Sequence, residues 1–190
     1  IVPPYYLALA LIMLAGLFTA AELPWFLGFA SNVRDSFQHP IGGPPDSMWS
    51  IAVEEQFYIV WPWIVLFVPR RLLPGVFLAV IVAALGVRAM LTPHGFDAVY
   101  RLTISRMDLL AAGAFLATIE ERDPDWFARQ SRFVVMIAAV AVAMFAGLTV
   151  SVPTFRTSLN TTLFNVVGFG LSTVFFTMTL IYIRGLGDGI

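Results

Sequence analysis

The chain has 190 residues, of which 59% are hydrophobic and 12% are charged, and this balance excludes an ordinary water-soluble domain. The net charge is -1 and all 11 basic residues are arginines, so the sequence offers no basic field for nucleic acid. Cysteine is absent, which excludes disulfides, thiolate metal sites and cysteine nucleophiles, and we expect no metal site.

Six apolar stretches follow one another along the chain, and each is long enough to cross a bilayer as a helix. They cover residues 5–21, 49–68, 72–91, 104–119, 133–152 and 159–183. The stretches are continuously apolar rather than alternating, which favours helices over strands, because a membrane has no water to satisfy open strand edges. The predicted fold class is therefore all-α, a polytopic transmembrane helical bundle of about six spans.

The arginines outside these spans predict an orientation, because arginine is enriched in cytoplasmic loops. If the first span starts inside, six arginines face inward and three face outward. The inward ones are Arg70, Arg71, Arg122, Arg129, Arg132 and Arg184, and the outward ones are Arg34, Arg101 and Arg156. Two further arginines, Arg88 and Arg106, lie inside spans near their outer ends. The longest connection, residues 22–48, would then face outward, where it could cover a site as a lid.

The chain begins with Ile1 and ends in a stretch, residues 185–190, that is typical of an interrupted loop. We interpret residues 1–190 as one transmembrane domain truncated at both ends, in a multi-pass protein of the inner membrane.

The second span contains charges that a hydrocarbon environment disfavours. Glu54, Glu55 and Gln56 follow one another inside it, with Glu54 roughly 7 Å along the helix from Trp49 at 1.5 Å per residue. A charged side chain at the centre of a span costs about 2.5 to 3.5 kcal/mol on insertion scales. Such a residue therefore indicates a functional or structural partner.

Helical spacing assigns the polar and aromatic residues of this span to one face. The members of that face are Ser50, Glu54, Phe57, Tyr58 and Trp61. Glu55 is rotated by about 100° from Glu54, so the two carboxylates do not form one acid–base pair.

The fourth span repeats the anomaly with Arg106 and Asp108. We predict that Arg106 pairs with Glu54, because pairing lowers the cost of burying both charges. Asp108 lies about 200° round the helix from Arg106 and is better placed to brace a neighbouring helix. A purely structural role, in which these charges join helices, is compatible with this interpretation.

The second span carries a motif, Ser50-x-x-x-Glu54-x-x-Phe57-Tyr58, that resembles the signature of the membrane-bound acyltransferase-3 family. The family pattern W-S-L-x-x-E-x-x-F-Y followed by W-P is matched by Trp49, Ser50, Ile51, Glu54, Phe57, Tyr58, Trp61 and Pro62, with Ile51 in place of leucine. Arg106 and Asp108 with Gly113 are similar to a later R-x-D-x-x-x-x-G element. The opening residues 1–6 are similar to the stretch after the family's arginine-rich element. The resemblance extends to about Ala117.

The resemblance implies a protein of about ten transmembrane helices that transfers an acyl group, often acetyl, from acyl-CoA to a hydroxyl. Acceptors in the family include glycans of the bacterial surface, such as lipopolysaccharide and exopolysaccharide. Nod factors and antibiotics are acceptors for other members. The implied partners are acyl-CoA as donor substrate, a carbohydrate acceptor and the lipid bilayer, with no bound cofactor. The family's central histidine would precede Ile1, so we expect the piece alone to be inactive.

Acyl transfer needs a base, a clamp for the developing oxyanion and exclusion of water. We assign the catalytic set to Glu54, Ser50, Tyr58 and Arg106, with Glu54 as base or as orienter of the upstream histidine and Arg106 as clamp. The expected substrate-binding residues are Trp49, Phe57, Trp61 and Asp108. His39 and His94 lie in predicted loops, where a histidine is usually solvated.

Two other classes remain open at this stage. A transporter or flippase for a lipid-linked glycan would use Glu54 and Arg106 for gating or proton coupling. A sensory or scaffolding membrane protein would use them only to fix helix register.

Overall fold

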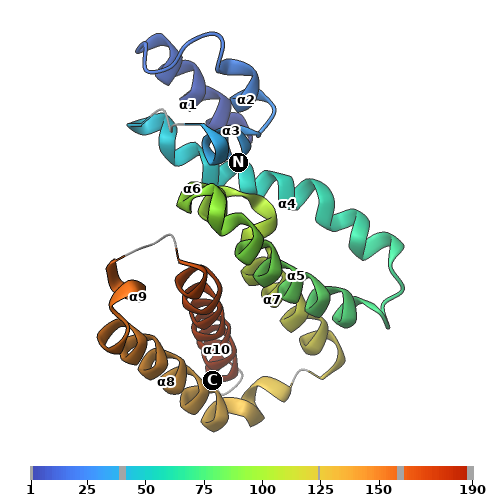
Figure 1. Ribbon diagram of the computed structural model, residues 1–190. Coiled ribbons are helices and arrows are strands. Elements are labelled where there is room, and N and C mark those ends of the chain that lie inside the picture. The colour runs from blue at the N-terminus through green and yellow to red at the C-terminus, as the bar shows by residue number, and fades with distance from the viewer. Residues whose placement is uncertain (1, 39–41, 124, 158–160, 188–190) are drawn as a thin grey trace. The chain divides into compact units, whose positions relative to one another are not determined.

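The structure is a computed structural model that describes residues 2–38, 42–123, 125–157 and 161–187. Within these ranges all regular structure is helical, which confirms the predicted all-α class. The chain divides into two compact units, Ile1–Phe67 with His94–Arg106 and Val68–Pro93 with Met107–Ile190. Figure 1 shows the succession of helices within each unit.

Four helical segments of the described residues are long and apolar enough to cross a membrane. They are Leu73–His94, Phe96–Arg122, Phe133–Ser151 and Leu163–Leu186. Four such helices in one chain indicate a multi-pass membrane protein. They correspond to the last four of the six predicted spans, although the predicted start at residue 159 lies outside the described residues.

The first two predicted spans do not meet the same criteria. Helix α1, Val2–Leu14, has 13 residues, fewer than the roughly 20 that a crossing needs. It stops there because the chain turns at Gly16, whose φ of 70° is readily adopted only by glycine. Helix α4, Met48–Phe67, has 20 residues and is long enough, but Glu54, Glu55 and Gln56 lower its hydropathy.

The first unit is built around α1 and the segment that follows it. Tyr5 and Leu9 pack against Phe18, Phe26 and Met48 in one buried cluster. The hydroxyl of Tyr5 donates a hydrogen bond to the carbonyl of Phe26 at 2.8 Å. This cluster connects α1 to helix α2, Leu23–Leu27, and to the first residue of α4.

The long outward connection that could act as a lid, residues 22–48, contains regular structure. Besides α2 it holds helix α3, Ser31–Phe37, and a 3-10 turn, η1, Pro44–Ser47. Four polar residues of α3 are buried, namely Ser31, Asn32, Asp35 and Ser36. Buried polar groups require hydrogen-bond partners, so this segment packs as part of the unit. Helix α3 contacts α4 and also α6, Phe96–Arg101.

The second unit contains helix α5, Leu73–Leu91, the first two residues of the short turn η2, Thr92–His94, and the main part of α7, Thr103–Arg122. Helix α8, Trp126–Ser151, is followed by α9, Pro153–Thr157. A π-helical segment, η3, Leu163–Gly168, then leads into α10, Phe169–Gly187.

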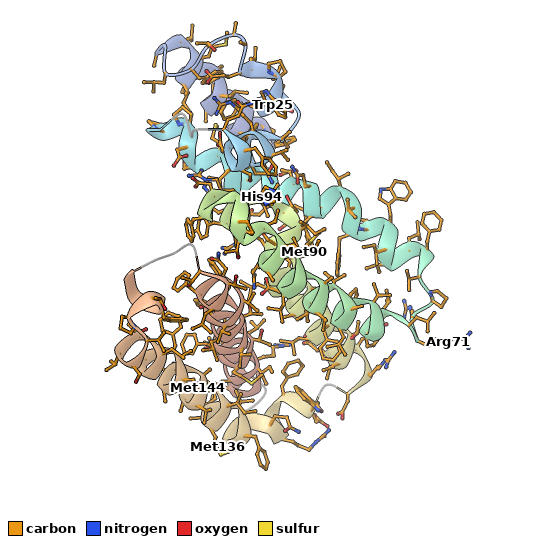
Figure 2. All side chains as sticks on the ribbon, viewed as in Figure 1. Trp25, Arg71, Met90, His94, Met136 and Met144 are labelled. Carbon is orange, nitrogen blue, oxygen red and sulfur yellow. The ribbon has the colours of Figure 1, made fainter. Side chains whose placement is uncertain are left out.

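Helices α8 and α10 form the most extensive helix pair of this unit and lie side by side in Figure 1. They run antiparallel, since Gly185 near the end of α10 approaches the backbone of Phe127 at the start of α8 so closely that a Cβ would stand 2.8 Å from its carbonyl oxygen. The opposite side of α8 is exposed and apolar. Met136 and Met144 stand out from that helix in Figure 2. An exposed apolar surface of this kind is expected where a helix meets lipid.

Candidate functional site

The motif residues lie on the first three turns of α4, and the turn η1 positions the start of that helix. Ser47 caps η1 by donating from its hydroxyl to the carbonyl of Pro44 at 2.9 Å. The hydroxyl of Ser50 donates to the carbonyl of Ser47 at 3.1 Å. Ser50 is thus oriented by the backbone one turn before it, and it is exposed.

The predicted polar and aromatic face of α4 divides into an exposed and a buried part. Glu54 and Tyr58 are exposed, as Ser50 is. Phe57 is buried and stacks on Trp61 with ring centroids 4.6 Å apart. The two aromatic residues therefore pack within the first unit, whereas the three hydrogen-bonding residues present their groups to the surroundings of this chain.

Trp49 and Arg106 come together through an aromatic residue that precedes α7. The ring of Tyr100 lies 5.0 Å from the ring of Trp49, and the guanidinium of Arg106 lies over the Tyr100 ring at 4.9 Å. Phe96 stacks on the same tyrosine at 5.1 Å. A cation over an aromatic face is attracted by the ring quadrupole, which holds Arg106 toward the start of α4. The direct pairing of Arg106 with Glu54 stays a prediction.

The opposite side of α4 carries a polar network that sequence reasoning missed. The side-chain amide of Gln56 donates to the carbonyl of Phe29 at 2.6 Å and to the amide oxygen of Asn32 at 2.8 Å. Asn32 donates to the hydroxyl of Thr103 at 2.9 Å, and Thr103 in turn donates to the amide oxygen of Gln56. The three side chains close a ring that joins α3, α4 and the start of α7. The only signal in the sequence was Gln56 itself, which follows the two glutamates.

Arg101 at the end of α6 is a second centre of polar contacts in the first unit. Its Nη1 donates to Asp46 at 2.8 Å and its Nε to Asp97 at 2.9 Å. Asp35 lies 4.0 Å from the same Nη1, and the guanidinium lies 5.6 Å from the centre of the Trp49 ring. From the sequence, only an outward loop position was predicted for Arg101. The structure makes it the link between η1, α3 and α6.

Arg34 extends this network along the segment of residues 22–37. It donates to Asp35 at 2.7 Å and to Glu22 at 2.8 Å. Burial raises the pKa of the Asp35 carboxyl, and the hydrogen bond from Arg34 opposes that rise. The backbone N–H of Thr19, which donates to Glu22 at 2.7 Å, lowers the pKa of the Glu22 carboxyl below its ordinary value.

Asp108 belongs to a separate set of contacts in the second unit. One of its oxygens accepts from Nη2 of Arg88 at 2.6 Å, and the other accepts from the Thr173 hydroxyl at 2.6 Å. Asp108 thus connects α7 to α5 and α10, as the expected bracing role requires. Its assignment to substrate binding stays a prediction. Of the two loop histidines, His94 is exposed and His39 lies outside the described residues.

Comparison with known proteins gives one partial match. The chain is similar to an O-acetyltransferase. This relative is the "Putative peptidoglycan O-acetyltransferase YrhL" of Bacillus subtilis strain 168, which is 32% identical over 102 residues. The match covers 50% of this chain and 16% of the length of YrhL.

No protein-family profile and no solved structure matches the chain. The similarity to YrhL agrees with the acyl-transfer chemistry that the α4 motif predicts, and it rests on a part of each protein.

Proposed function

We propose that this chain is part of an integral-membrane O-acyltransferase of the bacterial inner membrane. It would move an acetyl group from acetyl-CoA to a hydroxyl of a cell-surface glycan, and the name of YrhL makes peptidoglycan the first acceptor to test. The observation that carries the proposal is the motif on α4, with Glu54, Ser50 and Tyr58 exposed together and Arg106 held near Trp49 through Tyr100.

The proposed reaction breaks the C–S bond of the thioester and forms a C–O ester bond. Glu54 takes the proton of the acceptor hydroxyl, directly or by orienting a histidine elsewhere in the protein, and CoA leaves as the thiol. Arg106 stabilises the oxyanion that develops on the thioester carbonyl. Ser50 and Tyr58 hydrogen-bond the acceptor, while Trp49, Phe57 and Trp61 shape the site.

A gene deletion in the native host tests the proposal. The measurement is acetate released from surface glycan by mild alkali, after complementation with the full-length protein. We expect wild-type protein to restore acetylation, and Glu54→Gln and Arg106→Ala to lower it by at least about 100-fold, the range of a lost general base or oxyanion donor. The matched control is Glu55→Gln, which neutralises the neighbouring carboxylate on another face of α4.

Equal acetylation by the Glu54→Gln and Glu55→Gln proteins would remove the site assignment. A deletion strain with unchanged surface acetylation would remove the function.

A transporter or flippase is the second candidate, because ionisable residues such as Arg88 and Asp108 inside candidate spans are typical of transport proteins. It predicts that deletion changes the amount of glycan at the surface and not its acetyl content per sugar. Measuring both quantities in the same strain separates the two candidates.

A further inference from the structure

The second unit contains an enclosed polar cluster that the proposed acyl-transfer site does not use. Arg88, Asp108 and Asn165 are each at most 2% exposed, and they lie in three different candidate membrane spans. Thr92 joins two of them, since its hydroxyl donates to the carbonyl of Arg88 at 2.8 Å and accepts from the Asn165 amide at 3.1 Å. Ionisable residues in such positions mark functional sites by default.

Several polar atoms of this cluster make no hydrogen bond within the described residues. They are Nε and Nη1 of Arg88 and the amide oxygen of Asn165. An unsatisfied buried donor or acceptor costs about 1 to 3 kcal/mol, and no water is at hand inside a membrane. The cluster therefore presents donors on Arg88 and an acceptor on Asn165, both needing a partner.

The backbone conformation at Asn165 is also unusual and likewise favours a functional site. Asn165 lies in the π-helical segment η3, a conformation that is rare and is frequently found at functional sites. The residue that follows this segment, Phe169, places its ring 5.1 Å from the guanidinium carbon of Arg88. The irregular segment thus places an aromatic ring at the Arg88 guanidinium and the Asn165 amide at Thr92, whose hydroxyl binds the backbone carbonyl of Arg88.

The charges of the cluster define which ligand fits. The guanidinium of Arg88 is paired with the carboxylate of Asp108, so a charged ligand would leave net charge in the membrane. The unpaired atoms require a neutral group that offers an acceptor oxygen to Arg88 and a donor to Asn165. An amide has both, as a hydroxyl does, whereas a thioester or a ketone leaves the Asn165 oxygen unpaired.

We propose that Arg88 and Asn165 form an intramembrane binding site for an amide of the pantetheine arm of the acyl donor. This inference rests on the proposed function, because acyl-CoA is the substrate that carries such an arm. The arm is narrow and holds two amides along an otherwise apolar chain, which suits a site between helices. Both groups are enclosed in this structure, and the arm reaches them when the half-buried ring of Phe169 moves aside.

A binding experiment tests the site without requiring turnover. The full-length protein in detergent is heated with pantetheine or with an amide-free mercapto-alcohol of equal chain length, and the unfolding temperature is recorded. We expect pantetheine alone to raise that temperature, since a ligand of the native state stabilises it. Equal shifts with both thiols, or a shift with neither, would overturn the proposal.

Single substitutions test whether pantetheine binding depends on Asn165. Asn165→Leu should weaken pantetheine binding about 3- to 10-fold, the value of one hydrogen bond. Ser172→Ala is the matched control: it removes a hydroxyl that donates to the carbonyl of Gly168 outside the cluster, so pantetheine binding should stay within about twofold of wild type. Equal losses in both variants would mean that Asn165 acts only through packing.

Kinetics distinguish failure of this inference from failure of the proposed function. Asn165→Leu should raise KM for acetyl-pantetheine and leave KM for an acetyl alkyl thioester unchanged. Transfer from both donors with no selective effect of the variant overturns the amide site and keeps the acyltransferase. Stabilisation by pantetheine without transfer from any thioester supports the site and overturns the function.

Discussion

The two units each contain a buried arginine that meets aspartate, and their surroundings differ. Arg101 in the first unit is paired with Asp46 and Asp97, whose side chains are 35% and 45% exposed. Arg88 in the second unit is paired with Asp108, whose side chain is 2% exposed. Water reaches the partners of Arg101 and screens their charges, whereas the enclosed carboxylate of Asp108 is screened much less. The same residue types thus form partly exposed ion pairs in the first unit and a buried ion pair in the second.

The enclosed pair should show the largest effect on stability. Arg88→Met leaves the Asp108 charge buried without its counter-ion, which costs about 3 to 5 kcal/mol. Adding Asp108→Leu removes that charge and should restore most of the loss. Thermal unfolding of the two proteins in detergent measures the difference, and a double variant as unstable as Arg88→Met would contradict this account of the pair.

Breaking the hydrogen-bonded ring of Gln56, Asn32 and Thr103 should have the second-largest effect on stability. Gln56→Leu leaves the amide oxygen of Asn32 and the hydroxyl of Thr103 without their partner, at a cost of about 1 to 3 kcal/mol. Glu55→Gln, one residue away, changes a charge and keeps the ring. If both substitutions lower the unfolding temperature equally, the ring does not stabilise the first unit.

Replacing Arg101 should have a smaller effect, because its partners are partly exposed. Arg101→Lys keeps one ion pair and loses the second, since an ammonium cannot bridge Asp46 and Asp97 as the guanidinium does. We expect a loss of about 1 kcal/mol, measured by the same unfolding assay. A loss as large as that of Arg88→Met would erase the contrast between the units.

The smallest expected effect is the pH dependence of Glu22. Its carboxyl pKa is lowered in the folded protein from 4.5, so its contribution is present above pH 4.5 and is lost as the pH falls through the lower folded value. Because Glu22 is partly exposed, that contribution stays below about 1 kcal/mol. Wild type should therefore exceed Glu22→Gln in stability at pH 7 and lose that advantage progressively as the pH falls below 4.5. If the stability advantage of wild type over Glu22→Gln grows on acidification, the pKa of Glu22 is raised in the folded protein and not lowered.

Short elements and their ends could not be predicted from the sequence. The turn at Gly16 ends α1 early, and α2, α3 and η1 lie in the long connection, for which the sequence predicted no helices. A helix of five to seven residues has too few turns for a periodic pattern, and its stability comes from packing. The burial of Asn32 and Asp35 in α3 likewise could not be predicted, because a short polar stretch is ordinarily exposed.

The helical class, the four long apolar spans and the unusual charges at Glu54, Arg106, Asp108 and Arg88 could be predicted from the amino-acid sequence. These are local properties, because hydropathy and helical period are read from neighbouring residues. Which charged groups meet depends on the folded structure: Arg88 with Asp108, Arg101 with Asp46, and Arg106 over Tyr100. The pairs of Arg88 and Arg101 join residues 20 and 55 positions apart, and the Thr173 hydroxyl comes to Asp108 from 65 positions away. Such partners follow from how the helices pack, which no local pattern encodes.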